Sequence, residues 1–538
     1  MSDKSLPDQP NLEQYKKQAK DLLRARAQGS RAALDRIARH HPRLQNQAHA
    51  VRSAPFHLAD AQLVIAREHG FQSWPNFARH IETLRLSREI TSLDDAASRF
   101  IEAACSPRHG HRSGTLEEAE MILTRYPHVA ASSIYTAAIL ADEASVRAFL
   151  ARDASSATAK GRPLGCDALT YLCFSRYLRL DRARSEAFVR TARALLDAGA
   201  SPNTGWIEII DHPNPRPVLE AAIYGAAGVA QHAGLTRLLL ERGADPNDEE
   251  TAYHVIETYD NTVLKILLES GKLNEVSLST ALLRKCDWHD LVGLRLVLES
   301  GTNPNWTTRW GLTALHQSVR RDNRLAMIEL LLDYGADPAI PNREGKSALW
   351  IAVRRGRADA LDLFEKRGMA INFTGVDELI AACARNHKET IHSILAVEPQ
   401  LKPELIDQGG TLLAEFSGVG NLAGVRNLLD LGVSVTALYR EGDGYYGIAK
   451  ESTALHVAAW RARHDVVKEL IARGAPVNAR DAQDRTALQL AVKACVNSYW
   501  TELRSPDSVR ALLQAGASTE GIELPTGYDE IDKLLRDR

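Results

Sequence analysis

The sequence of 538 residues lacks the features that mark several common protein classes. Its six cysteines form no CxxC pair, so they fit reduced thiols in a core better than a disulfide framework or a zinc site. No uncharged stretch approaches the roughly 18 apolar residues that a membrane-spanning helix needs. The 66 Lys and Arg are balanced by 68 Asp and Glu, which disfavours nucleic acid or an anionic membrane as the partner.

Leader segments and enzyme motifs are also missing. The chain begins Met-Ser-Asp-Lys-Ser-Leu-Pro, without the apolar segment of a secretion signal, so we expect a cytoplasmic protein. It contains no phosphate-binding loop, dinucleotide-binding glycine pattern, HExxH zinc motif, GxSxG nucleophile turn or EF-hand loop. Cys105, His109 and His111 lie close together, but their spacing matches no standard zinc site. We therefore predict no catalytic residue, metal site or cofactor.

What the sequence does contain is an internal repeat. The string TALH at 313–316 is followed 34 residues later by SALW at 347–350, and TALH at 453–456 is followed 33 residues later by TALQ at 486–489. Each copy leads into an apolar helical run that a Gly-Ala turn closes, as Gly335 does after the leucines at 330–332. A period of about 33 residues with these strings resembles the ankyrin family.

That resemblance implies an all-α solenoid of about eleven stacked helix–turn–helix units with projecting hairpin fingers. Hydrophobic burial also favours stacking, because one helix pair cannot bury its own apolar face and needs neighbours on both sides. Turn glycines are 44 residues apart between Gly199 and Gly243 and 42 apart between Gly432, Gly474 and Gly516. We expect the extra residues in fingers or in loops between helices.

Four regions are predicted: an N-terminal helical module at 1–90, a helical connector at 91–130, the ankyrin array at 131–520 and a C-terminal capping helix at 521–538. Residues 58–81 resemble a helical module that precedes ankyrin arrays in uncharacterised bacterial proteins, which implies a bacterial source and no known activity. The first 90 residues carry 15 Lys and Arg against 9 Asp and Glu. Solvated helix faces account for this excess more simply than a basic arm for RNA does.

Aromatic and arginine side chains in the expected fingers predict a binding surface. Such residues supply most of the binding energy at protein interfaces. We therefore expect a monomeric scaffold that binds a protein partner, of unknown identity, through its concave face and fingers. The candidate contact residues are Trp206, Trp306, Arg309, Trp310, Tyr439, Tyr445 and Tyr446.

An alternative is an enzyme or a small-ligand binder with a polar pocket at about residues 250–325. Its candidate residues are Tyr253, His254, Glu257, Asp260, Trp288, His289, Asp290 and Asp322. Several of these stand where the glycine between the two helices of a repeat is expected. The simpler interpretation is that Asn261, Asp290 and Asn323 cap the helices that follow them. His316 and His456, inside TALH, resemble the ankyrin histidine that hydrogen-bonds between neighbouring loops.

Overall fold

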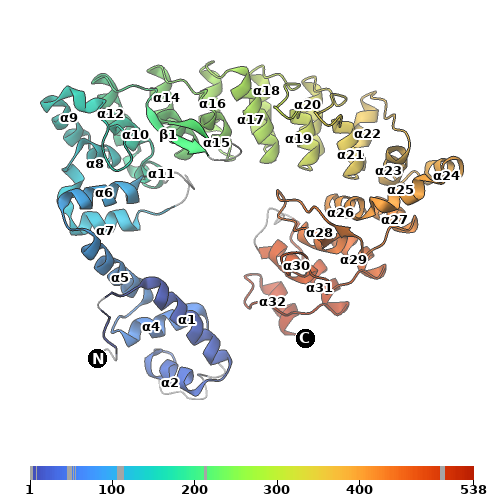
Figure 1. Ribbon diagram of the computed structural model, residues 1–538, viewed down its shortest axis with the longest axis horizontal. Helices are drawn as coiled ribbons and strands as arrows, with labels where there is room; N and C mark the ends of the chain where they lie inside the picture. Colours follow the sequence, from blue (N-terminus) through green and yellow to red (C-terminus); the bar gives the residue numbers. More distant parts are fainter. Residues whose placement is uncertain are drawn as a thin grey trace. The chain divides into compact units, whose positions relative to one another are not determined.

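The computed structural model of the chain describes residues 4–7, 9–44, 51, 54, 56–105, 114–210, 215–496 and 503–537 (Figure 1). These residues form short helices joined by turns, with two small antiparallel hairpins, and they divide into the compact units Met1–Val255 and Ile256–Arg538. No helix in these ranges is both long and apolar enough to cross a membrane. The predicted all-α repeat solenoid is confirmed, with the hairpins as local additions.

The first unit begins with a separate helical cluster. Its buried core joins Tyr15, Ile37, Val64 and Phe77. The second helix ends directly before His41 and Pro42, as the sequence indicates, because proline cannot continue a helix. The helices of this cluster are α1 (Leu12–Ala27), α2 (Arg31–His40), α4 (Leu58–Glu68) and α5 (Trp74–Glu89).

The rest of the first unit is built from stacked helix pairs. First helices of successive pairs contact one another, from α8 through α10 and α13 to α15, and second helices do the same from α9 through α12 to α14. The elements are α6 (Leu93–Ala104), α7 (Glu117–Arg125), α8 (Ile134–Ile139), α9 (Glu143–Arg152), α10 (Ala168–Cys173), α11 (Arg176–Leu180), α12 (Ser185–Asp197), β1 (Gly205–Ile210), β2 (Arg216–Ala221), α13 (Ala222–Tyr224), α14 (Ala233–Glu241) and α15 (Glu250–His254).

The insertion between Gly199 and Gly243 forms the hairpin of β1 and β2. The strands pair antiparallel, with Trp206 opposite Glu220 and Glu208 opposite Val218. These four side chains are buried, whereas Ile207 on the other face is 56% exposed. The extra residues therefore extend a finger, as expected from the spacing of the glycines.

The second unit has the same two-layer construction. One layer stacks α17, α19, α21 and α23 and then α26, α28 and α30, and the other stacks α16, α18, α20 and α22 and then α27, α29 and α31. The elements are α16 (Thr262–Glu269), α17 (Glu275–Asp287), α18 (Leu291–Glu299), α19 (Ala314–Arg320), α20 (Leu325–Asp333), α21 (Ala348–Arg354), α22 (Ala358–Lys366), α23 (Val376–Ala384), α24 (Lys388–Val397), α25 (Leu401–Asp407), α26 (Gly409–Val419), α27 (Leu422–Asp430), β3 (Leu438–Tyr439), β4 (Ser452–Thr453), α28 (Ala454–Trp460), α29 (His464–Ala472), α30 (Ala487–Val496), α31 (Asp507–Gln514) and α32 (Asp529–Arg536).

The TALH strings begin the first helix of a repeat and join it to the next repeat. Thr313 is the N-cap of α19, and its hydroxyl lies 2.8 Å from His316 Nδ1. The other ring nitrogen of His316 lies 3.1 Å from the carbonyl oxygen of Lys346 in the following finger. His456 makes the equivalent contact with Ala479 at 3.0 Å, so the predicted structural role of both histidines is confirmed.

The turn between the two helices of a repeat needs one residue in the left-handed conformation. Gly356 fills this place with φ +69°, and His289 and Asp322 fill it with φ +52° and +51°. Asp tolerates this conformation better than most residues other than glycine. The expected replacement of the turn glycine is therefore confirmed at His289 and Asp322. Asp260 has no positive φ, so the expectation is corrected there.

The cysteines lie in the core, as predicted. Cys105, Cys166, Cys173, Cys286, Cys383 and Cys495 are all free and buried. His109 and His111 lie outside the described residues, so the expectation about that loop is not tested. No cluster of three or more metal-ligating side chains occurs within the described ranges.

Candidate functional site

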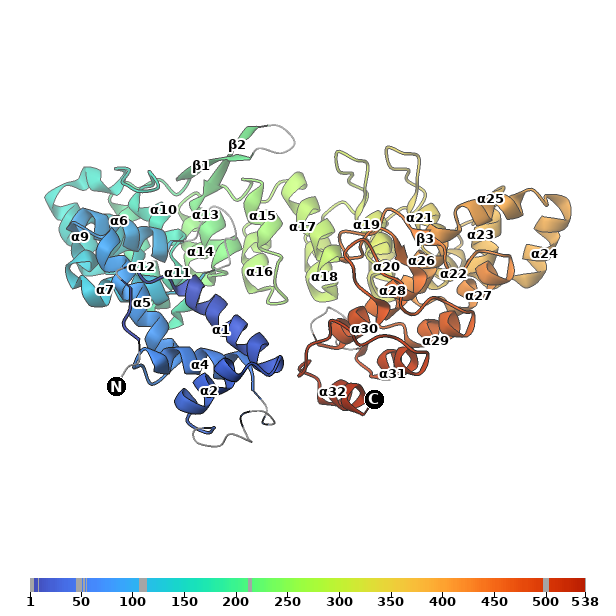
Figure 2. The same cartoon turned by 60° about the horizontal axis from the view of Figure 1, so that its bottom comes forward.

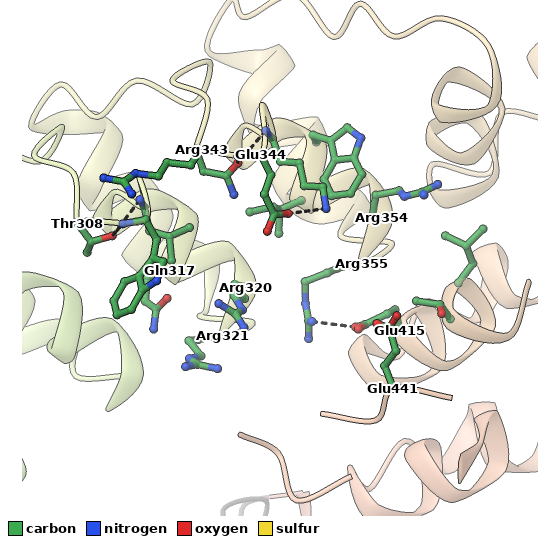
Figure 3. A pocket seen from close by; sticks show the side chains of 18 of the residues that line it. Thr308, Gln317, Arg320, Arg321, Arg343, Glu344, Arg354, Arg355, Glu415 and Glu441 are labelled. Atoms are coloured by element: carbon green, nitrogen blue, oxygen red, sulfur yellow. Dashed lines mark hydrogen bonds and ion pairs between the residues drawn. The ribbon is translucent and has the colours of Figure 1, made fainter. Parts of the chain in front are cut away.

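A cleft of about 900 Å³ opens on the first helices of the central repeats in the second unit (Figure 3). Its walls come from α19 and α21, from the fingers that precede them, and from α26 and the chain after β3. The lining includes the residues Thr308, Trp310, Leu312, Gln317, Arg320, Arg321, Asn342, Arg343, Glu344, Lys346, Trp350, Ile351, Arg354, Arg355, Gln408, Thr411, Leu412, Glu415, Tyr439 and Glu441.

The finger before α19 carries an exposed tryptophan at its tip. The Trp310 ring is 57% exposed, and the Arg309 guanidinium lies 4.1 Å from its centroid. Gly311 closes the turn, with its amide donating to Thr308 O at 2.8 Å. Trp306, earlier in the same finger, is half-buried.

Neighbouring fingers hold this tip in place. The Arg343 amide donates to Trp310 O at 3.2 Å, and the Asn305 side-chain amide donates to Gly335 O at 2.8 Å. Gly311 has φ +77°, and a Cβ there would come within 2.9 Å of the Arg343 nitrogen. Glycine is therefore required where the two fingers approach, and Figure 2 shows both loops projecting beside each other before α19 and α21.

The cleft has more positive than negative side chains. Arg320, Arg321, Arg343, Lys346, Arg354 and Arg355 line it, against Glu344, Glu415 and Glu441. Figure 3 shows Arg320, Arg321, Arg354 and Arg355 around one opening that Glu415 and Glu441 border.

Four of these six cations form ion pairs within the protein, and one of them is Lys346, which meets Glu344 at 2.8 Å. Arg321 pairs with Asp287 at 2.7 Å, Arg354 with Asp377 at 3.3 Å and Arg355 with Glu415 at 2.8 Å. Arg320 and Arg343 are exposed, and within the described part of the chain neither has an ion pair or a side-chain hydrogen bond. These two arginines are the cations best placed to meet an external ligand.

The three tyrosines of the long finger, residues 439–450, are not all exposed to solvent. Tyr439 and Tyr446 are each 6% exposed, with Tyr439 donating to Glu415 at 2.8 Å and Tyr446 to Asp322 at 3.1 Å. Tyr445 is 40% exposed, and its hydroxyl donates to Asp287 O at 2.7 Å. The finger contacts the inter-helix turns of earlier repeats, which corrects the expectation that all three rings face a partner.

Asp322 is the centre of this contact. Its side chain is 5% exposed and meets Arg355 at 2.7 Å and Arg461 at 2.6 Å. Burial alone would raise the pKa of Asp322, but Arg355 and Arg461 outweigh it and hold the pKa well below its ordinary value. Arginines therefore surround this carboxylate, so Asp322 does not belong to a polar pocket that is open to a ligand.

The other residues of the alternative pocket are held by the protein as well. Glu257 pairs with Arg284 at 3.1 Å, and Asp290 pairs with the buried Lys285 at 2.7 Å while capping α18. Asp260 accepts from the Thr262 amide at 3.0 Å. These carboxylates stabilise turns and helix ends of the second unit.

The aromatic and histidine residues of the alternative pocket are divided between the two units. Trp288 packs edge-on against Tyr259, and His289 Nδ1 accepts from the Asn323 side chain at 3.0 Å. In the first unit, Tyr253 is 41% exposed and His254 lies 3.1 Å from Glu250.

Two expected helix caps are corrected. Asn261 donates to Asp290 at 3.0 Å instead of accepting from its own helix, and Asn323 donates to Cys286 O at 2.9 Å. Both amides tie one repeat to its neighbour. Asp290 alone of the three predicted caps accepts from its helix, from the Gly293 amide at 2.9 Å.

Trp206, which was expected to contact a partner, is also buried. It is 8% exposed, and its ring centroid lies 4.2 Å from that of Phe174. Trp206 lies on the inward face of the β1–β2 hairpin, so its ring serves packing within the first unit.

Arg320, Arg343 and Arg355 were not among the residues expected from the sequence. A signal existed, because Val-Arg-Arg occurs at 319–321 and again 34 residues later at 353–355. Equal positions in stacked repeats lie on the same face, so this spacing indicates a row of arginines.

Comparisons with known proteins match parts of the chain. The family model described as ankyrin repeats (3 copies) matches residues 282–377 and 413–521. The crystal structure of the human ASB11 ankyrin repeat domain matches with 24% identity, covering 44% of this chain and 98% of that chain, at a TM-score of 0.20. No curated protein matches the sequence.

Proposed function

We propose that this chain, with ankyrin repeats at 282–377 and 413–521, is a cytoplasmic, monomeric scaffold that binds a protein partner at the cleft and the fingers beside it. Ankyrin repeats are generally protein-interaction scaffolds. The observation that carries the proposal is the exposed Trp310 ring, stacked by Arg309 at the mouth of the cleft. Tryptophan and arginine are the residue types most enriched among energetic hot spots.

The rigidity of the fingers supports this function. Hydrogen bonds between the fingers, from Arg343 to Trp310 and from Asn305 to Gly335, fix the tip before a partner arrives. A surface ordered in advance loses less conformational entropy on binding. Trp306, Arg309, Trp310 and Tyr445 remain in the proposed surface.

The enzymatic alternative has less support from the geometry. A catalytic carboxylate needs access to its substrate, whereas Asp290 and Asp322 are each about 5% exposed and joined to cations of the chain. Their arrangement stabilises the repeats.

Site-specific photo-crosslinking tests the proposal. A photoreactive phenylalanine analogue replaces Trp310 in one full-length protein and Arg237, exposed on α14, in a second. We expect irradiation in a cell lysate to join a partner protein to position 310 and not to position 237. Equal crosslinking at both positions, or none at 310, would contradict the proposed surface.

A further inference from the structure

The cleft of the second unit has a chemical character that specifies its partner further. Ligand pockets in proteins are roughly 300–1,000 Å³, so a cleft of about 900 Å³ can hold a short chain segment but not a folded domain. Six cations and three carboxylates line it. The ligand therefore needs to be narrow and to carry negative charge.

The charged side chains of the cleft that form no ion pair within the described residues support the same conclusion. Glu344 is joined to Lys346 at 2.8 Å, and Glu415 accepts from Arg355 and from Tyr439. The charged side chains that remain available to a ligand are Arg320 on α19, Arg343 on the next finger and Glu441 on the other wall. Two exposed arginines on one wall can each hold a carboxylate in bidentate geometry.

The long finger shows which side chains pack against the arginines at the ends of the first helices. The Arg321 guanidinium lies 3.4 Å from the centroid of the Tyr445 ring, and the Tyr445 hydroxyl reaches Asp287 O at 2.7 Å. Arg461 lies 4.1 Å from the centroid of the Tyr446 ring. A segment of this same chain thus places tyrosines against arginines that end the first helices of repeats.

Aromatic side chains remain available beside the two exposed arginines. Trp310 is 57% exposed, and Trp350 lies beside the cleft with the Lys346 ammonium 4.7 Å from the centroid of its ring. Such rings favour a ligand that brings its own apolar or aromatic group together with its charge.

We propose that the cleft binds an acidic peptide segment with an embedded tyrosine, its carboxylates meeting Arg320 and Arg343 and its ring lying beside Trp310. This inference rests on the proposed function and names the partner's chemistry. A single-stranded RNA fits less well, because it carries a phosphate at every nucleotide and Glu344 and Glu441 border the cleft, whereas a peptide can place neutral residues beside these two carboxylates.

Fluorescence anisotropy with defined probes tests the inference on the full-length protein. The first probe is a labelled peptide of Asp and Glu residues around one central Tyr. The second is the same peptide with every carboxylate replaced by its amide, and the third is a short polyuridine RNA. We expect the acidic peptide to bind tightest and to weaken as salt is raised.

Charge reversal locates the binding. Arg320→Glu together with Arg343→Glu should weaken the acidic peptide at least about tenfold. The matched control is Arg237→Glu with Arg295→Glu, which makes the same charge change at exposed positions on α14 and α18 and should leave affinity within about twofold. If the reversed variant does not fold by circular dichroism, Arg320→Gln with Arg343→Gln replaces it, with loss of the acidic peptide again expected.

The inference is overturned if the amide peptide binds as tightly, if the control reversal weakens binding equally, or if the RNA binds tightest. Failure of this inference is distinguishable from failure of the proposed function. If a partner crosslinks at position 310 but the acidic peptide does not bind, the proposed peptide chemistry is wrong and the proposed function stands. If the peptide binds through Arg320 and Arg343 but nothing crosslinks at position 310, the peptide site is supported and the proposed partner surface on the fingers is wrong.

Discussion

Arg461 Nη1 lies 2.6 Å from Asp322 Oδ2, although the two residues are 139 positions apart in the chain. Arg461 ends the first helix of a late repeat, and Asp322 stands in the inter-helix turn of a central one. The contact fixes the long finger between these repeats, because Tyr446 donates to the same carboxylate. One ion pair thereby shapes a wall of the cleft.

Removing the charge of Asp322 should destabilise the protein strongly. Asp322→Asn retains the shape and tolerates the left-handed conformation, but it removes the anion that the buried Arg355 and Arg461 share. Breaking a buried ion pair costs about 3–5 kcal/mol. Chemical denaturation would measure the loss of unfolding free energy.

Asp333→Asn is the matched control, since Asp333 is 53% exposed and pairs with Arg367 at 2.7 Å. A surface pair contributes about 0–1 kcal/mol. Equal effects of the two substitutions would contradict the central place of Asp322.

The two neighbouring tyrosines should differ in their contributions. Tyr446→Phe removes a hydroxyl that is bonded to buried Asp322, and about 1–2 kcal/mol of stability should be lost. Tyr445→Phe, at a ring that is 40% exposed, should cost less, because water can replace its bond. Hydrogen exchange of the 438–453 backbone should rise in the first variant only. A larger effect at Tyr445 would show that the finger is held elsewhere.

Leu331 tests the stacking of repeats. It is fully buried on α20, so Leu331→Ala should cost about 2–5 kcal/mol through lost burial and a remaining cavity. Val292→Ala on α18, at a side chain that is 66% exposed, serves as the control and should change stability little. A loss below about half a kcal/mol for Leu331→Ala would contradict burial between neighbouring repeats.

Glu220 should make the first unit sensitive to pH. Burial and the nearby Glu250, Glu208 and Asp248 raise its pKa to about 8, against an opposing effect of His254. The folded state therefore holds a proton that the unfolded state loses near pH 4.5, so stability falls as pH rises from about 4.5 to 8.

Glu220→Gln removes this ionisation. The variant should melt several degrees above the parent at pH 8 and at the same temperature near pH 4.5. Glu241→Gln, at an exposed position on α14, should melt like the parent at both values. Identical melting of Glu220→Gln and the parent at pH 8 would show that Glu220 is already ionised without cost.

Local and periodic features could be predicted from the sequence. Gly335 has φ +86° at the end of a helix, and the TALH histidines bridge repeats, because both depend on contacts within one or two periods. The path of the long finger could not be predicted, since the contact of Arg461 with Asp322 depends on how many repeats accumulate between them. Trp206 was misplaced because finger residues can face inward as well as outward.

Two of the arginines that line the cleft could have been predicted from the sequence. Arg320 and Arg354 occupy equal positions 34 residues apart, which predicts their common face. Their different roles could not be inferred in the same way. Arg354 meets Asp377 from another repeat, whereas the residue 34 positions before Asp377 is Arg343, so Arg320 meets no acid in the same register.

The most direct test of the recognition surface is the affinity of the crosslinked partner, once purified, for the Trp306→Ala and Trp310→Ala double variant. We expect a loss of at least about 2 kcal/mol in binding free energy with an unchanged melting temperature, because these rings anchor the partner and not the fold. Unchanged affinity, or a loss that accompanies unfolding, would contradict it.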